Sequence, residues 1–286
     1  MEQFVVNTAS NILNKKVFFI KRLLGGMSNY TCVIKDEDGN FYTFRIPGKN
    51  ANNFVDRLVE KANLDLLNDF ELTNKTIYID TNVGYKISSY IEGDILSQIE
   101  NKNSYLSEVA KTLVKLHKID KKCQNDYDKL GRLTKYENLV KELNYDIDDR
   151  YFQYKEEYLK LYNEFENIEK CISHGDFQPS NLILVNNEVF VVDFEFTANN
   201  DPYYDIACYG NNDFEDAKLL LKEYLGRDYT NYEFRRLIEN RLFQTLQWHL
   251  VATYKNLIGL SEELKLDFGK IADIYLQKSK ILLETL

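Results

Sequence analysis

Three polar side chains between residues 174 and 193 have the types and the spacing that phosphoryl transfer needs. Asp176 and Asn181 are five residues apart, and Asp193 follows twelve residues after Asn181. A carboxylate can orient and deprotonate an attacking hydroxyl, while amide and carboxylate oxygens can bind Mg²⁺ on a phosphate chain. Because these residues follow a short strand and enclose a predicted hairpin, we expect them to converge on one cleft. The alternative is a structural turn that Asn181 merely caps.

The hydrophobic pattern changes near residue 92, and this change predicts two parts. Before it, alternating runs predict strands near 17–20, 30–35, 41–46, 76–79 and 85–91, with a short helix at 2–14. After it, helices are predicted at 104–117, 134–146, 154–169 and from 205 onward, with short strands at 171–173, 181–185 and 188–194. The fold class is therefore α+β. An antiparallel β-rich lobe with one inserted helix spans 1–91, and a mostly helical lobe spans 92–286.

The inserted helix follows the strand at 41–46. Strand alternation places Arg45 on the face opposite Phe44. Asn52 or Asn53 is expected to cap the helix, which would run to about residue 68. Its expected buried stripe is apolar and consists of Val55, Leu58, Val59, Ala62 and Leu66.

His174, Asp176, Asn181 and Asp193 together match the pattern H-x-D-x-x-x-x-N followed by an Asp that ends a strand. In this pattern the chain resembles the aminoglycoside phosphotransferase and choline kinase superfamily. The resemblance implies a two-lobed protein-kinase-like fold and an enzyme that uses ATP and Mg²⁺. It also implies that Asp176 is the catalytic base and that Asn181 and Asp193 are magnesium ligands. His174 is expected to brace the loop backbone.

Two shorter runs of sequence narrow the resemblance to one group within this superfamily. A Gly-Gly-Met-Ser-Asn turn at 25–29 and an Arg-Ile-Pro-Gly strand end at 45–48 resemble the bacterial, LicA-type choline kinases. Glycines let a backbone approach phosphate oxygens closely. The residues that the resemblance implies beside the nucleotide phosphates are Gly25, Gly26, Ser28, Asn29 and Arg45.

Arg45 should be held by a carboxylate on the helix that follows it, as in the kinase Lys–Glu pair. Glu60 is the expected partner, Asp56 is the alternative, and a solvated Glu60 is the simpler interpretation. By its position, the segment 88–93 resembles the hinge whose backbone binds adenine. The hinge residues expected to contact the nucleotide are Ser89, Tyr90 and Ile91.

Choline is the expected acceptor. A quaternary ammonium has no N–H to donate, so aromatic faces and carboxylates hold it best. The residues expected around it, besides Asp176, are Gln178, Glu195, Phe196, Tyr204 and Trp248. Choline kinases often carry a second Trp, which Phe243 or Tyr254 would replace here. Asp205 resembles the family's Asp that braces the catalytic loop, although an ordinary helix N-cap is also consistent with it.

The composition excludes several other classes. The net charge is −9 and the pI is near 5.1, with no basic cluster for nucleic acid. The four cysteines show no paired spacing, so we expect reduced thiols in a cytoplasmic protein. No signal peptide and no membrane-inserted segment is expected. The sequence leaves the oligomeric state open.

Three competing functions remain at this stage. Ethanolamine or aminoglycoside phosphorylation would use the same catalytic loop. A catalytically inactive nucleotide-binding scaffold is the alternative from another class, and it would usually have lost Asp176, Asn181 or Asp193. Protein kinase activity is disfavoured because the chain has Asp-Phe-Glu at 193–195 in place of Asp-Phe-Gly.

Overall fold

The computed structural model describes residues 1–23 and 29–286. These residues form two compact units, one made of 1–125 with 171–199 and the other of 126–170 with 200–286. The predicted boundary at 91/92 falls inside the first unit, because 92–125 and 171–199 belong to the same compact unit as the N-terminal sheet. The assignment of nucleotide and substrate binding to separate lobes stays a prediction. Gly25, Gly26 and Ser28 lie outside the described residues.

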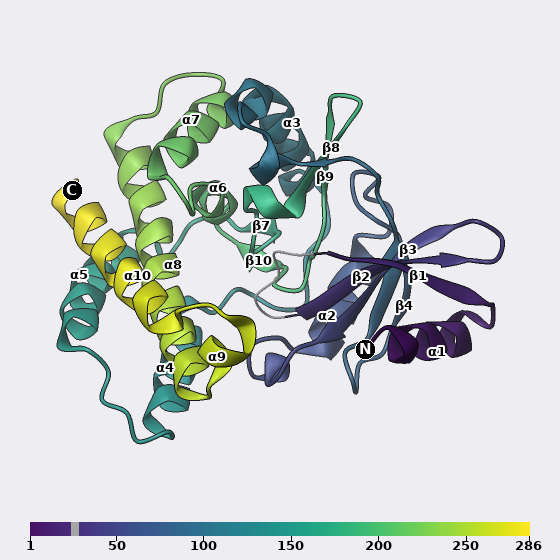
Figure 1. The fold of residues 1–286 in the computed structure, drawn as a ribbon. Coiled ribbons are helices and arrows are strands. Elements are labelled where there is room, and N and C mark those ends of the chain that lie inside the picture. The colour runs from purple at the N-terminus through teal and green to yellow at the C-terminus, as the bar shows by residue number, and fades with distance from the viewer. Residues whose placement is uncertain (24–28) are drawn as a thin grey trace. The chain divides into compact units, whose positions relative to one another are not determined.

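The first unit contains a five-stranded antiparallel sheet in the order β1-β2-β3-β5-β4 (Figure 1). Its strands are β1 (Val17–Leu23), β2 (Asn29–Asp36), β3 (Phe41–Pro47), β4 (Thr76–Ile79) and β5 (Lys86–Ser89). Its helices are α1 (Glu2–Leu13), α2 (Arg57–Leu66) and α3 (Leu106–His117). Further short strands are β6 (Asp94–Ile95), β7 (Cys171–Ser173), β8 (Leu182–Val185), β9 (Glu188–Val191) and β10 (Ala198–Asn200). The predicted antiparallel N-terminal sheet is confirmed.

The two faces of the sheet differ in chemistry. Phe44 and Ile87 are fully buried and pack with Val5 and Ala9 of α1. Strand alternation turns the next residue of β3, Arg45, to the opposite face, where its β5 neighbour in register is Lys86. One face is therefore an apolar core against α1, whereas the other presents two cations.

Helix α2 lies against the cationic face and differs from its prediction. Asp56, not Asn52 or Asn53, caps it, because the Asp56 carboxylate accepts hydrogen bonds from the N–H groups of residues 58 and 59. The predicted apolar stripe is also wrong, since Leu58 is 69% exposed. The fully buried residues of the helix are Arg57, Glu60 and Asn63, spaced three apart on one face. Charge pairing with the sheet, not apolar burial, decides which face points inward.

The second unit is built around the long helix α8 (Asn231–Leu257). The helices of this unit that pack on α8 are α4 (Lys129–Lys141), α5 (Asp149–Phe165), α6 (Tyr203–Tyr209), α9 (Leu260–Leu264) and α10 (Phe268–Glu284), with α7 (Phe214–Leu225) beside α6 (Figure 1). The predicted helices at 134–146 and 154–169 begin five residues earlier, because Asp128 and Asp148 cap them. The mostly helical C-terminal part is confirmed. Among the described helices, none has the length and apolarity that crossing a membrane requires.

Replacing Phe44 with Ala should lower the free energy of unfolding by about 3–5 kcal/mol, since the ring is fully buried against α1. Phe41 on the same strand is the matched control, because it is an exposed phenylalanine. Phe41→Ala should cost about 1 kcal/mol or less. Chemical denaturation measures both changes, and equal losses would contradict the assigned faces.

Candidate active site

The loop after β7 is held by the imidazole of His174, which is fully buried. The Asp176 backbone N–H donates to His174 Nδ1 at 3.1 Å, and His174 Nε2 lies 3.0 Å from the Val192 carbonyl oxygen. Because the first partner is a donor and the second an acceptor, the ring must be the neutral tautomer with its proton on Nε2. His174 therefore ties the loop to the segment after β9, and its bracing role in the active enzyme stays a prediction.

Gly175 permits the sharp turn between His174 and Asp176. Its φ is +81°, a left-handed conformation that glycine adopts without strain. A Cβ at this position would collide with the carbonyl of Phe196. The loop thus packs closely on the chain that follows Asp193, and a side chain at 175 would separate them.

The carboxylate of Asp176 is fixed by two amides. Its Oδ2 accepts from Gln178 Nε2 at 3.0 Å and from Asn181 Nδ2 at 2.9 Å. Burial and the nearby charge of Asp193 raise the pKa of Asp176 to about 8, against the opposing effect of the two amide bonds. When it is ionised, a carboxylate with such a raised pKa is a stronger base toward an alcohol than an ordinary aspartate.

Asp193 is placed beside this loop by the backbone. The Val192 N–H donates to the Asn181 carbonyl at 3.0 Å, so Asp193 immediately follows a residue tied to the loop. Strand β9 ends at Val191, earlier than predicted, and Asp193 has a φ of +69°. Because Asp193 lies beyond the end of β9, the alternation of side chains along a strand does not fix which way its carboxylate points.

The donor set fits a magnesium ion. The amide nitrogen of Asn181 is turned toward Asp176, which leaves its carbonyl oxygen facing the other way. The Asp193 side chain is 36% exposed and has one long contact, 3.4 Å from Arg45. Two oxygen donors of this kind are what Mg²⁺ takes from a protein when phosphates and water supply the rest.

Arg45 and Glu60 form a bidentate ion pair. The two distances are 2.7 Å from Nη1 to Oε1 and 2.8 Å from Nη2 to Oε2. Against the opposing effect of burial, the carboxylates of Glu60 and Glu195 raise the pKa of Arg45 above its usual range, and the cations Lys86 and Arg45 hold the pKa of Glu60 well below its usual range. Glu60, rather than Asp56, is thus the carboxylate that meets Arg45.

Two cations near Glu60 were missed by the sequence analysis. Arg57 Nη1 lies 2.7 Å from Glu60 Oε2, and Lys86 Nζ lies 3.3 Å from Glu60 Oε1. Arg57 precedes Glu60 by three residues on α2, a spacing that would have revealed it. Lys86 could not be found without the pairing of β5 with β3.

Glu195, predicted to bind substrate, faces these cations in the structure. Its Oε2 lies 3.2 Å from Arg45 Nη1 and 3.1 Å from Arg57 Nη1. Asn29 Nδ2 donates to both of its oxygens at 3.3 and 3.4 Å. Burial and the charge of Asp193 raise the pKa of Glu195. A substrate contact by Glu195 stays a prediction, and it would require some of these bonds to open.

The predicted hinge residues use part of their backbone in the sheet. The Ser89 N–H donates to the Lys75 carbonyl at 2.8 Å, and the Tyr90 N–H donates to the Phe41 carbonyl at 3.0 Å. A backbone N–H offered to adenine by these three residues would therefore come from Ile91.

The remaining predicted residues differ in exposure. Tyr204 is 1% exposed, its hydroxyl lies 2.7 Å from that of Tyr127, and its ring packs on buried Phe243. This burial makes Tyr204 and Phe243 core residues in the structure, which argues against their forming open aromatic walls. Trp248 on α8 and Phe196 are half-buried. Asp205 is fully buried on α6, and its role as a brace stays a prediction.

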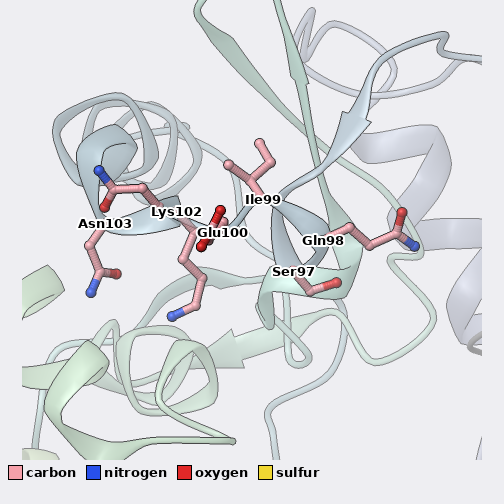
Figure 2. Close-up of a pocket in the computed structure, with 7 residues that line it drawn as sticks. Ser97, Gln98, Ile99, Glu100, Lys102 and Asn103 are labelled. Carbon is pink, nitrogen blue, oxygen red and sulfur yellow. The ribbon is translucent and has the colours of Figure 1, made fainter.

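A surface hollow in the first unit is lined by a single continuous segment, residues 97–103 (Figure 2). None of the predicted site residues lines it. The 3₁₀ turn at its start, Leu96–Gln98, packs against the 3₁₀ turn Pro179–Asn181 of the catalytic loop. The hollow thus lies on a segment whose first turn contacts the catalytic loop.

Comparisons with known proteins agree with this geometry. Residues 20–238 match the phosphotransferase enzyme family (APH). Protein LicA of Haemophilus influenzae is 29% identical over 244 residues, covering 79% of this chain and 70% of that protein. Choline kinase LicA from Streptococcus pneumoniae has a TM-score of 0.79 and 22% identity, covering 100% of this chain and 99% of that one. A choline/ethanolamine kinase family protein from Mesorhizobium loti has a TM-score of 0.75 and 20% identity, covering 93% and 88%. The predicted kinase-like fold is confirmed.

Replacing Asp193 with Asn should lower the pKa of Asp176 below its value of about 8, because the repelling charge is removed. Asn tolerates the left-handed backbone at this position. Carboxyl ¹³C NMR of the protein without nucleotide or metal measures the titration, and Asp176→Asn identifies the signal. Asp69→Asn, an exposed carboxylate in the same unit, is the control that should leave it in place. An unchanged pKa in Asp193→Asn would contradict the proximity of the two carboxylates.

Proposed function

Because the chain belongs to the phosphotransferase enzyme family, we propose that it transfers the γ-phosphoryl group of ATP to the hydroxyl of choline, giving phosphocholine and ADP. The observation that carries this proposal is the placement of Asp176, held by Asn181, beside Asp193 and the Arg45–Glu60 pair. These groups supply a base, metal ligands and a phosphate-binding cation. The LicA proteins and choline kinases among the relatives support choline as the acceptor.

In this mechanism Asp176 accepts the hydrogen bond of the choline hydroxyl and takes its proton as the oxygen attacks the γ-phosphorus. The amides of Gln178 and Asn181 hold the carboxylate in one orientation, so little reorganisation is needed when the alcohol arrives. His174 keeps its proton on Nε2 and fixes the loop, and it takes no part in proton transfer.

Arg45 binds the phosphate chain, and Glu60 fixes the orientation of its guanidinium. Asn181 and Asp193 would hold Mg²⁺, which supplies charge neutralisation on the transferred group when it is bound. Gly25, Gly26, Ser28 and Asn29 would line the phosphates. Ser89, Tyr90 and Ile91 would border the adenine.

The acceptor is a small cationic alcohol. An enzyme with a net charge of −9 attracts such a molecule, and aromatic faces then hold its ammonium group. Phe196 and Trp248 are the aromatic residues with exposed surface that we assign to it. Tyr204 is a further residue that we assign to the acceptor from the sequence, although its own surface is covered.

Ethanolamine is the second acceptor to consider, since the chain carries a single Trp and one structural neighbour is a choline/ethanolamine kinase family protein. Aminoglycosides remain the more distant alternative. A catalytically inactive scaffold is disfavoured, because base, metal ligands and cation are all present. We place the enzyme in the cytoplasm, where ATP is available and where its cysteines, which form no disulfide among the described residues, stay reduced.

A panel of hydroxyl acceptors tests the substrate. With ATP and Mg²⁺, ADP release should be fastest with choline, slower with ethanolamine and absent with kanamycin. Asp176→Asn is the control for the assigned base and should lower choline turnover by about 10²–10⁴-fold with nucleotide binding kept. Choline turnover at the background rate in the unchanged protein would refute the proposed acceptor.

A further inference from the structure

The three buried cations around Glu60 differ in which other carboxylates they contact. Three cations, Arg45, Arg57 and Lys86, contact its carboxylate, and all three side chains are less than one-tenth exposed. Only Arg45 and Arg57 reach on to Glu195, whose side chain is also buried. Arg45 is the one that also contacts Asp193, so its Nη1 is divided among three carboxylates.

Arg57 is firmly placed. The turn that contains Gly84 covers it, and a Cβ at Gly84 would lie only 3.0 Å from Arg57 Nε. Its Nη2 is buried and has no hydrogen-bond partner among the described residues. The arginine is therefore held by packing, by a long hydrogen bond from Nε to Asn52 Oδ1 at 3.5 Å, and by two carboxylates that both contact Nη1.

Nucleotide binding should change the pairing of Arg45. To bind a phosphate, the Arg45 guanidinium must give up some of its contacts with the carboxylates of Glu195 and Asp193. Without Arg57, this change would leave the buried Glu195 carboxylate with no cation, and an unpaired buried charge is strongly unfavourable. Asn29 is a neutral donor at 3.3–3.4 Å and would not replace the lost cation.

Building on the proposed function, we propose that Arg57 is a positioning residue that keeps Glu195 paired and thereby releases Arg45 to the triphosphate. Arg57 contacts Glu60 and Glu195 with the same nitrogen and has no contact with Asp193 among the described residues. It can therefore stay in place while Arg45 turns. Arg57 acts on the nucleotide only through Glu195 and Arg45.

Lys86 provides the matched control. It is a buried cation on the same carboxylate, Glu60, but it has no contact with Glu195 among the described residues. Removing Lys86 takes a positive charge from the same cluster without leaving Glu195 unpaired. The two cations therefore differ in the one contact on which the inference depends.

The experiment measures the Kd of ATP with Mg²⁺ by calorimetry, without choline, in single and double variants. Arg57→Met should weaken ATP binding by about tenfold or more in the unchanged protein. In the Glu195→Gln background the same change should weaken it by no more than about twofold, because position 195 then carries no charge that needs a cation. Lys86→Met should have the same effect in both backgrounds. Arg57→Lys keeps a cation where one nitrogen, Nη1, makes both carboxylate contacts, so it should bind ATP within about threefold of the unchanged protein.

An equal loss from Arg57→Met in both backgrounds would overturn the proposal, as would a loss of about tenfold or more in Arg57→Lys. Thermal unfolding shows whether each variant is folded. If Arg57→Met does not fold, the Kd of ATP for Arg57→Lys decides the question. The choline assay is separate. Failure of choline turnover with the expected ATP pattern would refute the acceptor and leave the role of Arg57 standing.

Discussion

The buried carboxylate of Glu60 is the charge on which the rest of the site depends. A carboxylate with no exposed side-chain surface must be paired, and here strand β3 supplies Arg45, strand β5 supplies Lys86 and the same helix supplies Arg57. This requirement fixes which face of α2 points at the sheet. It also explains why a helix with a buried polar face is stable next to a sheet whose other face is an ordinary apolar core.

The catalytic loop depends on a second constraint, in which backbone geometry replaces charge. His174 links the Asp176 amide to the Val192 carbonyl, and Gly175 lets the loop approach Phe196. Asp193, which lies beyond the end of β9, has a left-handed backbone conformation. The two constraints meet at Arg45, which contacts both Asp193 and Glu195. The site thus combines the charge network around Glu60 with a catalytic loop whose backbone is held by His174.

The parts of this arrangement that could be predicted are the local ones. The spacing of Asp176, Asn181 and Asp193 and the alternation along β3 are written in short stretches of sequence, and the structure brings those residues together. The buried face of α2 was predicted wrongly, because an apolar stripe is normally the buried one and Leu58 seemed part of it. Lys86 becomes a partner of Glu60 only through the pairing of β5 with β3, which sets Lys86 beside Arg45, far away in the sequence, and leaves no local signal. The burial of Tyr204 could not be predicted, because the sequence does not show which of the 17 Phe and 21 Tyr residues belong to the core.

The most direct test of the central claim is a double-mutant cycle of Arg45→Met and Glu60→Gln, with the Kd of ATP and Mg²⁺ as the measured quantity. If Glu60 serves ATP by orienting Arg45, each single change weakens binding by about tenfold or more. The double variant should then bind ATP no more weakly than Arg45→Met alone, within about twofold. Losses that simply multiply in the double variant would mean that the two residues act independently, and they would contradict a site organised around the Glu60 carboxylate.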